Sequence, residues 1–151
     1  ERQIFFVGIG GFDSHDNQIQ DQPGLLGGIS DGLTAFYDAT VELGVADVVT
    51  AFTQSDFGRT LTSNGDGTDH AWGSNQIVVG DSVAGQRIVG NYPLLQIGGN
   101  DDVGGGRMIP TTSADQLAAT LAKWFGINDS DLDVVAPNIG NFAVRDLGFM
   151  V

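Results

Sequence analysis

The chain has 151 residues, of which 41% are hydrophobic, and these values suit one domain (residues 1–151) with a core of its own. Its 19 acidic residues against 6 basic ones give a net charge of −13, which argues against nucleic acid or an anionic membrane as a partner, because both need a basic face. The lack of cysteine excludes a disulfide framework, a thiolate metal site and a cysteine nucleophile.

The first third of the chain predicts a strand, a helix and a second strand. Ile4–Ile9 is apolar without alternation, which is typical of a central parallel strand. Apolar residues then recur at helical spacing over Pro23–Leu43, and Val45–Thr53 predicts the next strand. Together these elements predict a right-handed βαβ unit. We interpret three glycines of the predicted helix as points of close packing against the sheet: Gly27, Gly28 and Gly32.

The middle of the chain predicts loops and short strands. Phe57–Gly73 is expected to be a long loop, since polar and glycine residues dominate it. Gln76–Val79 and Gln86–Val89 predict two short strands, which could pair as a hairpin. Asn91–Met108 is rich in glycine and predicts an irregular segment that is flexible or covers a ligand.

The C-terminal third carries a clear helix signal. Ser113 and Gln116 form a capping box, in which each side chain satisfies a free backbone N–H near the start of the helix. Gly126 is expected to end this helix. Asp129–Val135 predicts one further helical turn, and the apolar tail Phe142–Val151 is expected to dock on the body.

Carboxylate and imidazole side chains follow both predicted strands of the βαβ unit. Because the carboxyl ends of parallel strands meet at one edge of a sheet, we expect these groups to meet at a common rim. Such ligands suit zinc or another divalent transition ion, whereas carboxylates alone suit calcium or magnesium. The pattern predicts a divalent metal site, with zinc first and manganese, calcium or magnesium as alternatives. Its candidate ligands are Asp13, His15, Asp56, Asp69 and His70.

Each candidate also has a simpler interpretation. Asp13 and His15 could belong to a polar loop before a helix, and His70 could be a hydrogen-bonded loop histidine. Arg59 is a rare cation beside the acidic loop, and its planar fork of donors could clamp an anionic substrate in a catalytic role. The alternative for Arg59 is a structural ion pair with a neighbouring aspartate, Asp56 or Asp69.

Three motifs, in this order, resemble a known family: Gly10–His15, Ser55–Thr60 and Gly67–Gly73. They resemble the bacterial proteins grouped as domain of unknown function 1501, relatives of the alkaline phosphatase and sulfatase superfamily. The resemblance implies an α/β fold with a mostly parallel central sheet flanked by helices, as in alkaline phosphatase. It also implies a two-metal hydrolase that acts on phosphate or sulfate esters in the periplasm or outside the cell.

Within this resemblance, Asp13 and His15 match the ligands of the first metal, and His70 matches the histidine that completes that site. Asp56 stands at the aspartate of the second metal, whose histidine is replaced by Phe57. The superfamily's nucleophile lies in a region that would precede this chain, which therefore looks like the C-terminal portion of a longer protein.

The resemblance thus implies two partners, an anionic small-molecule ester and a second polypeptide, which is the N-terminal portion of the same protein or another copy. Two further functions stay open at this point. The chain could be a non-catalytic, acidic extracellular module for cation binding or assembly. It could also be a relative that keeps the fold and has lost its metals, which the replacement at Phe57 suggests.

Overall fold

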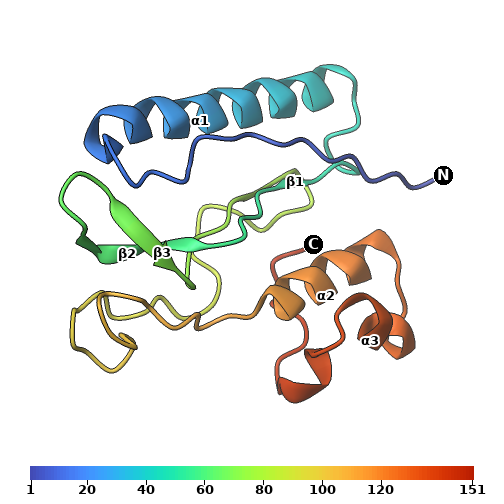
Figure 1. Cartoon of the computed structure of the whole chain (residues 1–151). Coiled ribbons are helices and arrows are strands. Elements are labelled where there is room, and N and C mark those ends of the chain that lie inside the picture. Colours follow the sequence, from blue (N-terminus) through green and yellow to red (C-terminus); the bar gives the residue numbers. More distant parts are fainter.

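A long helix lies over two small sheets in the computed structural model, which describes residues 1–151 (Figure 1). The helix is α1, Gln18–Glu42. Strand β1, Ala51–Phe52, pairs antiparallel with β4, Val78–Val79. Strand β2, Gly58–Ser63, pairs antiparallel with β3, Thr68–Ala71, to form a hairpin. No helix of this structure combines the length and the hydropathy that crossing a bilayer requires.

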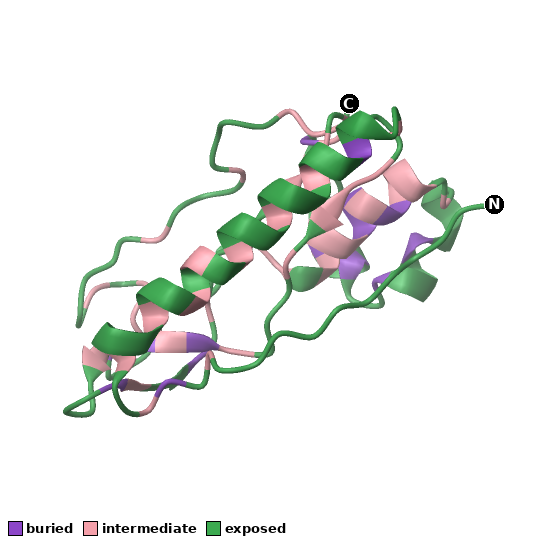
Figure 2. Cartoon of the chain, turned by 90° about the horizontal axis from the view of Figure 1, so that it is seen from above, coloured by how far each residue is buried: buried purple, intermediate pink, exposed green.

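The C-terminal part is helical and contains the main buried cluster. Helix α2, Ala114–Phe125, packs on α3, Leu132–Val135, which two short 3-10 turns flank, Asp129–Asp131 and Ile139–Asn141. Figure 2 shows buried residues gathered in this part, whereas α1 and the N-terminal segment are mostly exposed. The cluster consists of small and medium apolar side chains: Ala119, Ala122, Leu132, Ala136 and Ile139.

The predictions for this C-terminal part are confirmed. The Ser113 hydroxyl accepts hydrogen bonds from the N–H groups of Asp115 and Gln116, and the Gln116 side chain accepts one from the Ser113 N–H. Gly126 caps the end of α2 with a φ of 98°, a conformation that glycine adopts without strain. The tail docks as expected, because Phe149 is buried.

The predicted mostly parallel central sheet flanked by helices is wrong, and with it the alkaline-phosphatase-like fold. The sheets are two antiparallel pairs, and the expected βαβ unit is absent. Ile4–Ile9 runs extended without a neighbouring strand, only two residues of Val45–Thr53 are in a strand, and Gln86–Val89 forms none. A strand needs a partner for its backbone groups, and apolar composition alone does not supply one.

The expected long loop over Phe57–Gly73 is also wrong, because most of it is the β2–β3 hairpin. In β2, threonine occurs at every second position, Thr60 and Thr62. In its first half, the buried residues Gly58 and Thr60 flank the half-buried Arg59. The turn residues Asn64–Gly67 separate the two strands. Alternation in the strand before an Asn-Gly turn favours a hairpin here.

The predicted helix over Pro23–Leu43 is confirmed as α1, which begins earlier, at Gln18. The close packing assigned to its glycines is wrong. A Cβ added at Gly27, Gly28 or Gly32 would meet no atom within 4 Å. These glycines therefore face open space, and they cost α1 backbone entropy without a packing benefit.

We expect Gly28→Ala to raise the free energy of unfolding by about 0.5–1 kcal/mol, because alanine loses less backbone entropy in a helix. Gly44→Ala is the matched control just beyond the same helix. A Cβ there would also meet no atom, but Gly44 has a φ of 67°, so alanine should destabilise. Urea denaturation measures both changes. Equal effects of the two substitutions would contradict this explanation.

The glycine-rich segment Asn91–Met108 is irregular, as predicted, and Asp102 organises it. The Asp102 carboxylate accepts hydrogen bonds of 2.8 Å from the N–H groups of both Gly98 and Gly104. These bonds, that of Gly98 first, lower the pKa of Asp102 below its ordinary value of 3.8. The ionised carboxylate therefore holds the turns of this segment together.

The pKa of Asp102 gives a prediction for acid conditions. Because it is lowered in the folded state, its stabilising effect is present above pH 3.8 and is lost as the pH falls through the lower folded value. The Gly98 and Gly104 amide signals, followed by NMR, should titrate with a midpoint below 3.8. In Asp102→Asn this titration should vanish. A wild-type midpoint at or above 3.8 would refute the role of these hydrogen bonds.

Candidate metal centre

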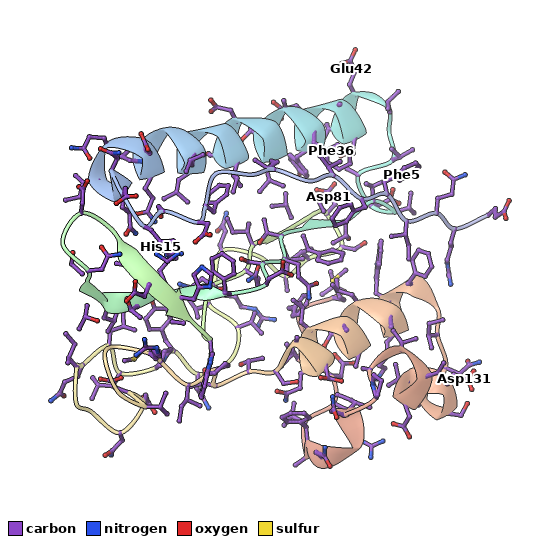
Figure 3. The ribbon with its side chains drawn as sticks, in the orientation of Figure 1. Phe5, His15, Phe36, Glu42, Asp81 and Asp131 are labelled. Atoms are coloured by element: carbon purple, nitrogen blue, oxygen red, sulfur yellow. The ribbon has the colours of Figure 1, made fainter.

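Asp13, His15 and His70 come together where the loop before α1 meets the β2–β3 hairpin. In Figure 3, His15 lies between the start of α1 and this hairpin. The two imidazole rings are 5.0 Å apart between centroids, although they are 55 positions apart in the chain. The structure thus brings three of the five candidate ligands together, and a hairpin produces this meeting and not the rim of a parallel sheet.

Backbone contacts hold the loop and the hairpin together. The Thr68 N–H donates to the Ser14 carbonyl over 3.3 Å, and the Asn64 side-chain amide donates to the His15 carbonyl over 3.2 Å. Gly67 packs directly against the backbone of the loop. A Cβ at this position would lie only 2.4 Å from the backbone atoms of Ser14 and His15, so no larger residue fits. The hairpin turn therefore fixes where His15 stands.

Three ligand atoms form a small triangle. Asp13 Oδ1 lies 2.7 Å from His70 Nε2 and 2.9 Å from His15 Nε2, and the two Nε2 atoms are 3.2 Å apart. Ligand atoms with bonds of about 2.0–2.1 Å lie about 2.9 Å apart around an octahedral ion and about 3.3 Å apart around a tetrahedral one. The triangle therefore matches the spacing of three protein ligands on one side of a divalent ion.

Hydrogen bonds and a metal ion are alternative ways to satisfy these three atoms. Each Nε2 carries at most one proton. If both Nε2 atoms are protonated, both donate to Asp13 Oδ1, over 2.9 Å from His15 and 2.7 Å from His70. If both are unprotonated, the two imidazole lone pairs and the carboxylate oxygen are the donor set that a divalent cation accepts.

Arg59 supports Asp13 from behind. Its Nη1 donates to Asp13 Oδ1 over 2.8 Å, and its other donors bind the Thr68 hydroxyl and carbonyl. The alternative of a structural ion pair is thus present, with Asp13 as the partner in place of Asp56 or Asp69. The hydrogen bond from His70, followed by that from Arg59, lowers the pKa of Asp13, so this carboxylate stays ionised at neutral pH.

The ring of Phe57 stacks on the imidazole of His70, with centroids 4.0 Å apart and planes 11° from parallel. Phe57 therefore packs against one face of His70 and orients its ring. The guanidinium carbon of Arg59 lies over the Phe57 ring, 5.7 Å from its centroid. Stacking was not predicted from the sequence, because nothing in the spacing of Phe57 and His70 shows their register in the hairpin.

The two remaining predicted ligands lie outside the triangle. The group whose ligand atoms all lie within 4.8 Å of one another contains neither Asp56 nor Asp69. Asp69 Oδ1 lies 3.6 Å from His15 Nδ1, on the side of the ring away from the triangle. It can therefore orient His15 from behind, as carboxylates often do for metal-binding histidines. Asp56 is exposed in the loop before β2.

Arg59→Lys is expected to weaken metal binding by about 10–100-fold, because lysine keeps the charge but loses the planar fork that orients Asp13. The free energy of unfolding should fall by about 1–2 kcal/mol, since two hydrogen bonds to Thr68 are lost as well. Metal titration and urea denaturation measure the two effects. Wild-type affinity in the lysine variant would show that charge alone matters at this position.

The comparisons with known proteins give one match. The family model described as "Protein of unknown function (DUF1501)" matches residues 1–139. No curated protein and no solved structure matches the chain. The matched residues include all three motifs and every side chain of the triangle. The chain therefore belongs to the DUF1501 family.

Proposed function

We propose that the chain forms the metal centre of a metal-dependent hydrolase, with Asp13, His15 and His70 as ligands of one divalent ion. The observation that carries this proposal is the triangle of ligand atoms, whose sides of 2.7, 2.9 and 3.2 Å suit three ligands of one ion. Two histidines and a carboxylate with open positions are typical of catalytic zinc and of other catalytic transition metals. Zinc is the first candidate, followed by manganese, calcium and magnesium.

The exposure of the ligands supports a catalytic role. The side chains of Asp13, His15 and His70 are 56%, 43% and 51% exposed, so solvent and substrate can reach the open side of the ion. Such an ion supplies Lewis-acid chemistry and a water of lowered pKa. The protein's own residues hold and orient the ion: Asp13 through Arg59, His70 through Phe57, and His15 through Asp69.

We propose phosphate or sulfate esters as substrates, which the resemblance to phosphatases and sulfatases supports. The same resemblance supports a periplasmic or extracellular location. In this proposal Arg59 is a positioning residue, because its donors are used by Asp13 and Thr68. The anion clamp suggested by the sequence would have to release Asp13 first.

The same exposure also favours a second candidate, a cation-binding module without catalytic activity, because the side chains of the triangle do not enclose a substrate. In this case the ion would serve stability or assembly. Both candidates require metal binding, and they differ in turnover.

The test uses the purified chain, stripped by a chelator and reloaded with zinc, manganese, calcium or magnesium in turn. Hydrolysis of p-nitrophenyl phosphate and p-nitrophenyl sulfate is expected with at least one metal and is expected to be lost in His70→Ala. Metal binding without turnover of either ester would favour the binding module. A protein that binds none of the four ions would overturn both proposals.

A further inference from the structure

The Thr68 hydroxyl lies between Arg59 and the first residue of α1. Thr68 Oγ1 is 3.0 Å from Arg59 Nε and 2.8 Å from Gln18 Oε1. A guanidinium can only donate, so the Thr68 oxygen must accept from Arg59. Its one proton then goes to Gln18, whose side chain must present its oxygen and not its nitrogen. The Thr68 hydroxyl is therefore used in one direction only, as an acceptor from Arg59 and a donor to Gln18.

Gln18 is held by the hairpin and by its own helix. It begins α1, and its backbone N–H donates over 3.2 Å to the carbonyl of Asp66, in the turn between β2 and β3. Figure 1 shows the start of α1 beside this turn. The Gln18 side-chain Nε2 donates over 3.1 Å to Gln22 Oε1, one turn further along the helix. These two bonds keep the Gln18 oxygen in place for the Thr68 hydroxyl.

Arg59 extends this series of hydrogen bonds to a ligand of the metal centre. Its side chain is only 15% exposed, and its Nη1 donates to Asp13 Oδ1 over 2.8 Å. Because the guanidinium is planar and rigid, the direction of its Nε–H also fixes the direction of Nη1. The Thr68 carbonyl accepts from the same guanidinium, so removal of the hydroxyl alone loosens Arg59 without releasing it.

We propose that Thr68 and Gln18 are positioning residues of the metal centre, which orient Arg59 and through it the Asp13 carboxylate toward the ion. These roles rest on the proposed function, because they require that Asp13 binds an ion. They differ from a purely structural role in one measurable respect. A contact that only joins α1 to the hairpin would change the stability of the protein, whereas positioning residues also change its affinity for the ion.

The test measures how tightly the purified chain binds zinc, or whichever of the four ions the wild type binds most tightly, by titration calorimetry. Thr68→Val removes the hydroxyl and Gln18→Met removes its acceptor. Each variant should bind the ion about threefold to tenfold more weakly, because each loses one hydrogen bond of the series. Thr68→Ser keeps the hydroxyl and Gln18→Glu keeps the acceptor oxygen, so both should retain most of the wild-type affinity.

Thr62→Val is the matched control, because the Thr62 hydroxyl belongs to the same hairpin but donates to the Gly105 carbonyl. It should bind the ion like the wild type. A second comparison uses Arg59→Met, which has no side-chain donor. In this background Thr68→Val should cause no further loss of affinity, whereas two independent effects would add.

A wild type that binds the ion while Thr68→Val and Gln18→Met keep its full affinity would overturn these roles and leave the proposed function standing. So would a loss in Thr68→Val that is equally large with and without Arg59. A wild type that binds none of the four ions would overturn the proposed function and these roles together.

Discussion

Wild-type protein is expected to bind one zinc ion per chain, and His70→Ala is expected to bind it at least about 100-fold more weakly. Even residues behind a metal ligand change affinity by about 10–100-fold, and His70 supplies one of three ligand atoms directly. The side chain is half exposed, so its removal leaves no buried cavity. Titration calorimetry on chelator-treated protein measures the affinity, and elemental analysis of dialysed protein measures the stoichiometry.

Two further variants show whether the triangle is the site. His15→Ala should weaken binding as strongly as His70→Ala, because both Nε2 atoms belong to the triangle. Asp56→Ala should bind zinc like the wild type, although the sequence pattern places Asp56 among the ligands. If Asp56→Ala lost zinc while His15→Ala kept it, the ligand set derived from the structure would be wrong.

Gly67→Ala is expected to lower the free energy of unfolding by about 2–3 kcal/mol and to weaken zinc binding in the same variant. The new methyl group would overlap the backbones of Ser14 and His15, and backbone cannot turn away as the end of a long side chain can. Relief of this overlap would have to move His15 away from His70. Urea denaturation and zinc titration measure the two effects.

Gly10→Ala is the matched control for this substitution, because a Cβ at Gly10 would meet no atom within 4 Å and the residue precedes the same loop. Its stability and zinc affinity should stay close to those of the wild type. A Gly67→Ala protein with normal stability and normal affinity would show that the loop and the hairpin do not touch as described.

Local signals in the sequence predicted the helices well. The capping box of Ser113 and Gln116, the left-handed cap at Gly126 and the helical spacing of α1 involve residues a few positions apart. Such signals need no knowledge of the rest of the fold. The sheet was predicted wrongly because the strand assigned to Ile4–Ile9 depends on distant partners, and the sequence does not show whether those partners are present.

The meeting of Asp13, His15 and His70 was expected for a reason that the structure does not support. The expectation used the carboxyl ends of parallel strands, whereas the side chains meet where an antiparallel hairpin docks on a loop. The residues that make this docking possible, such as Gly67, act through steric fit. A single sequence carries no sign of steric fit, and for this reason the supporting residues were missed.

Helix α1 lies between His15 and His70 in the sequence, and this affects how the protein resists heat and chelators. An ion shared by these residues would crosslink two points 55 positions apart and close a loop that contains the whole helix. Like a covalent bridge, such a crosslink restricts the unfolded chain most when the loop is long. Depletion of the ion should therefore loosen α1 at temperatures at which α2 and α3 are still intact.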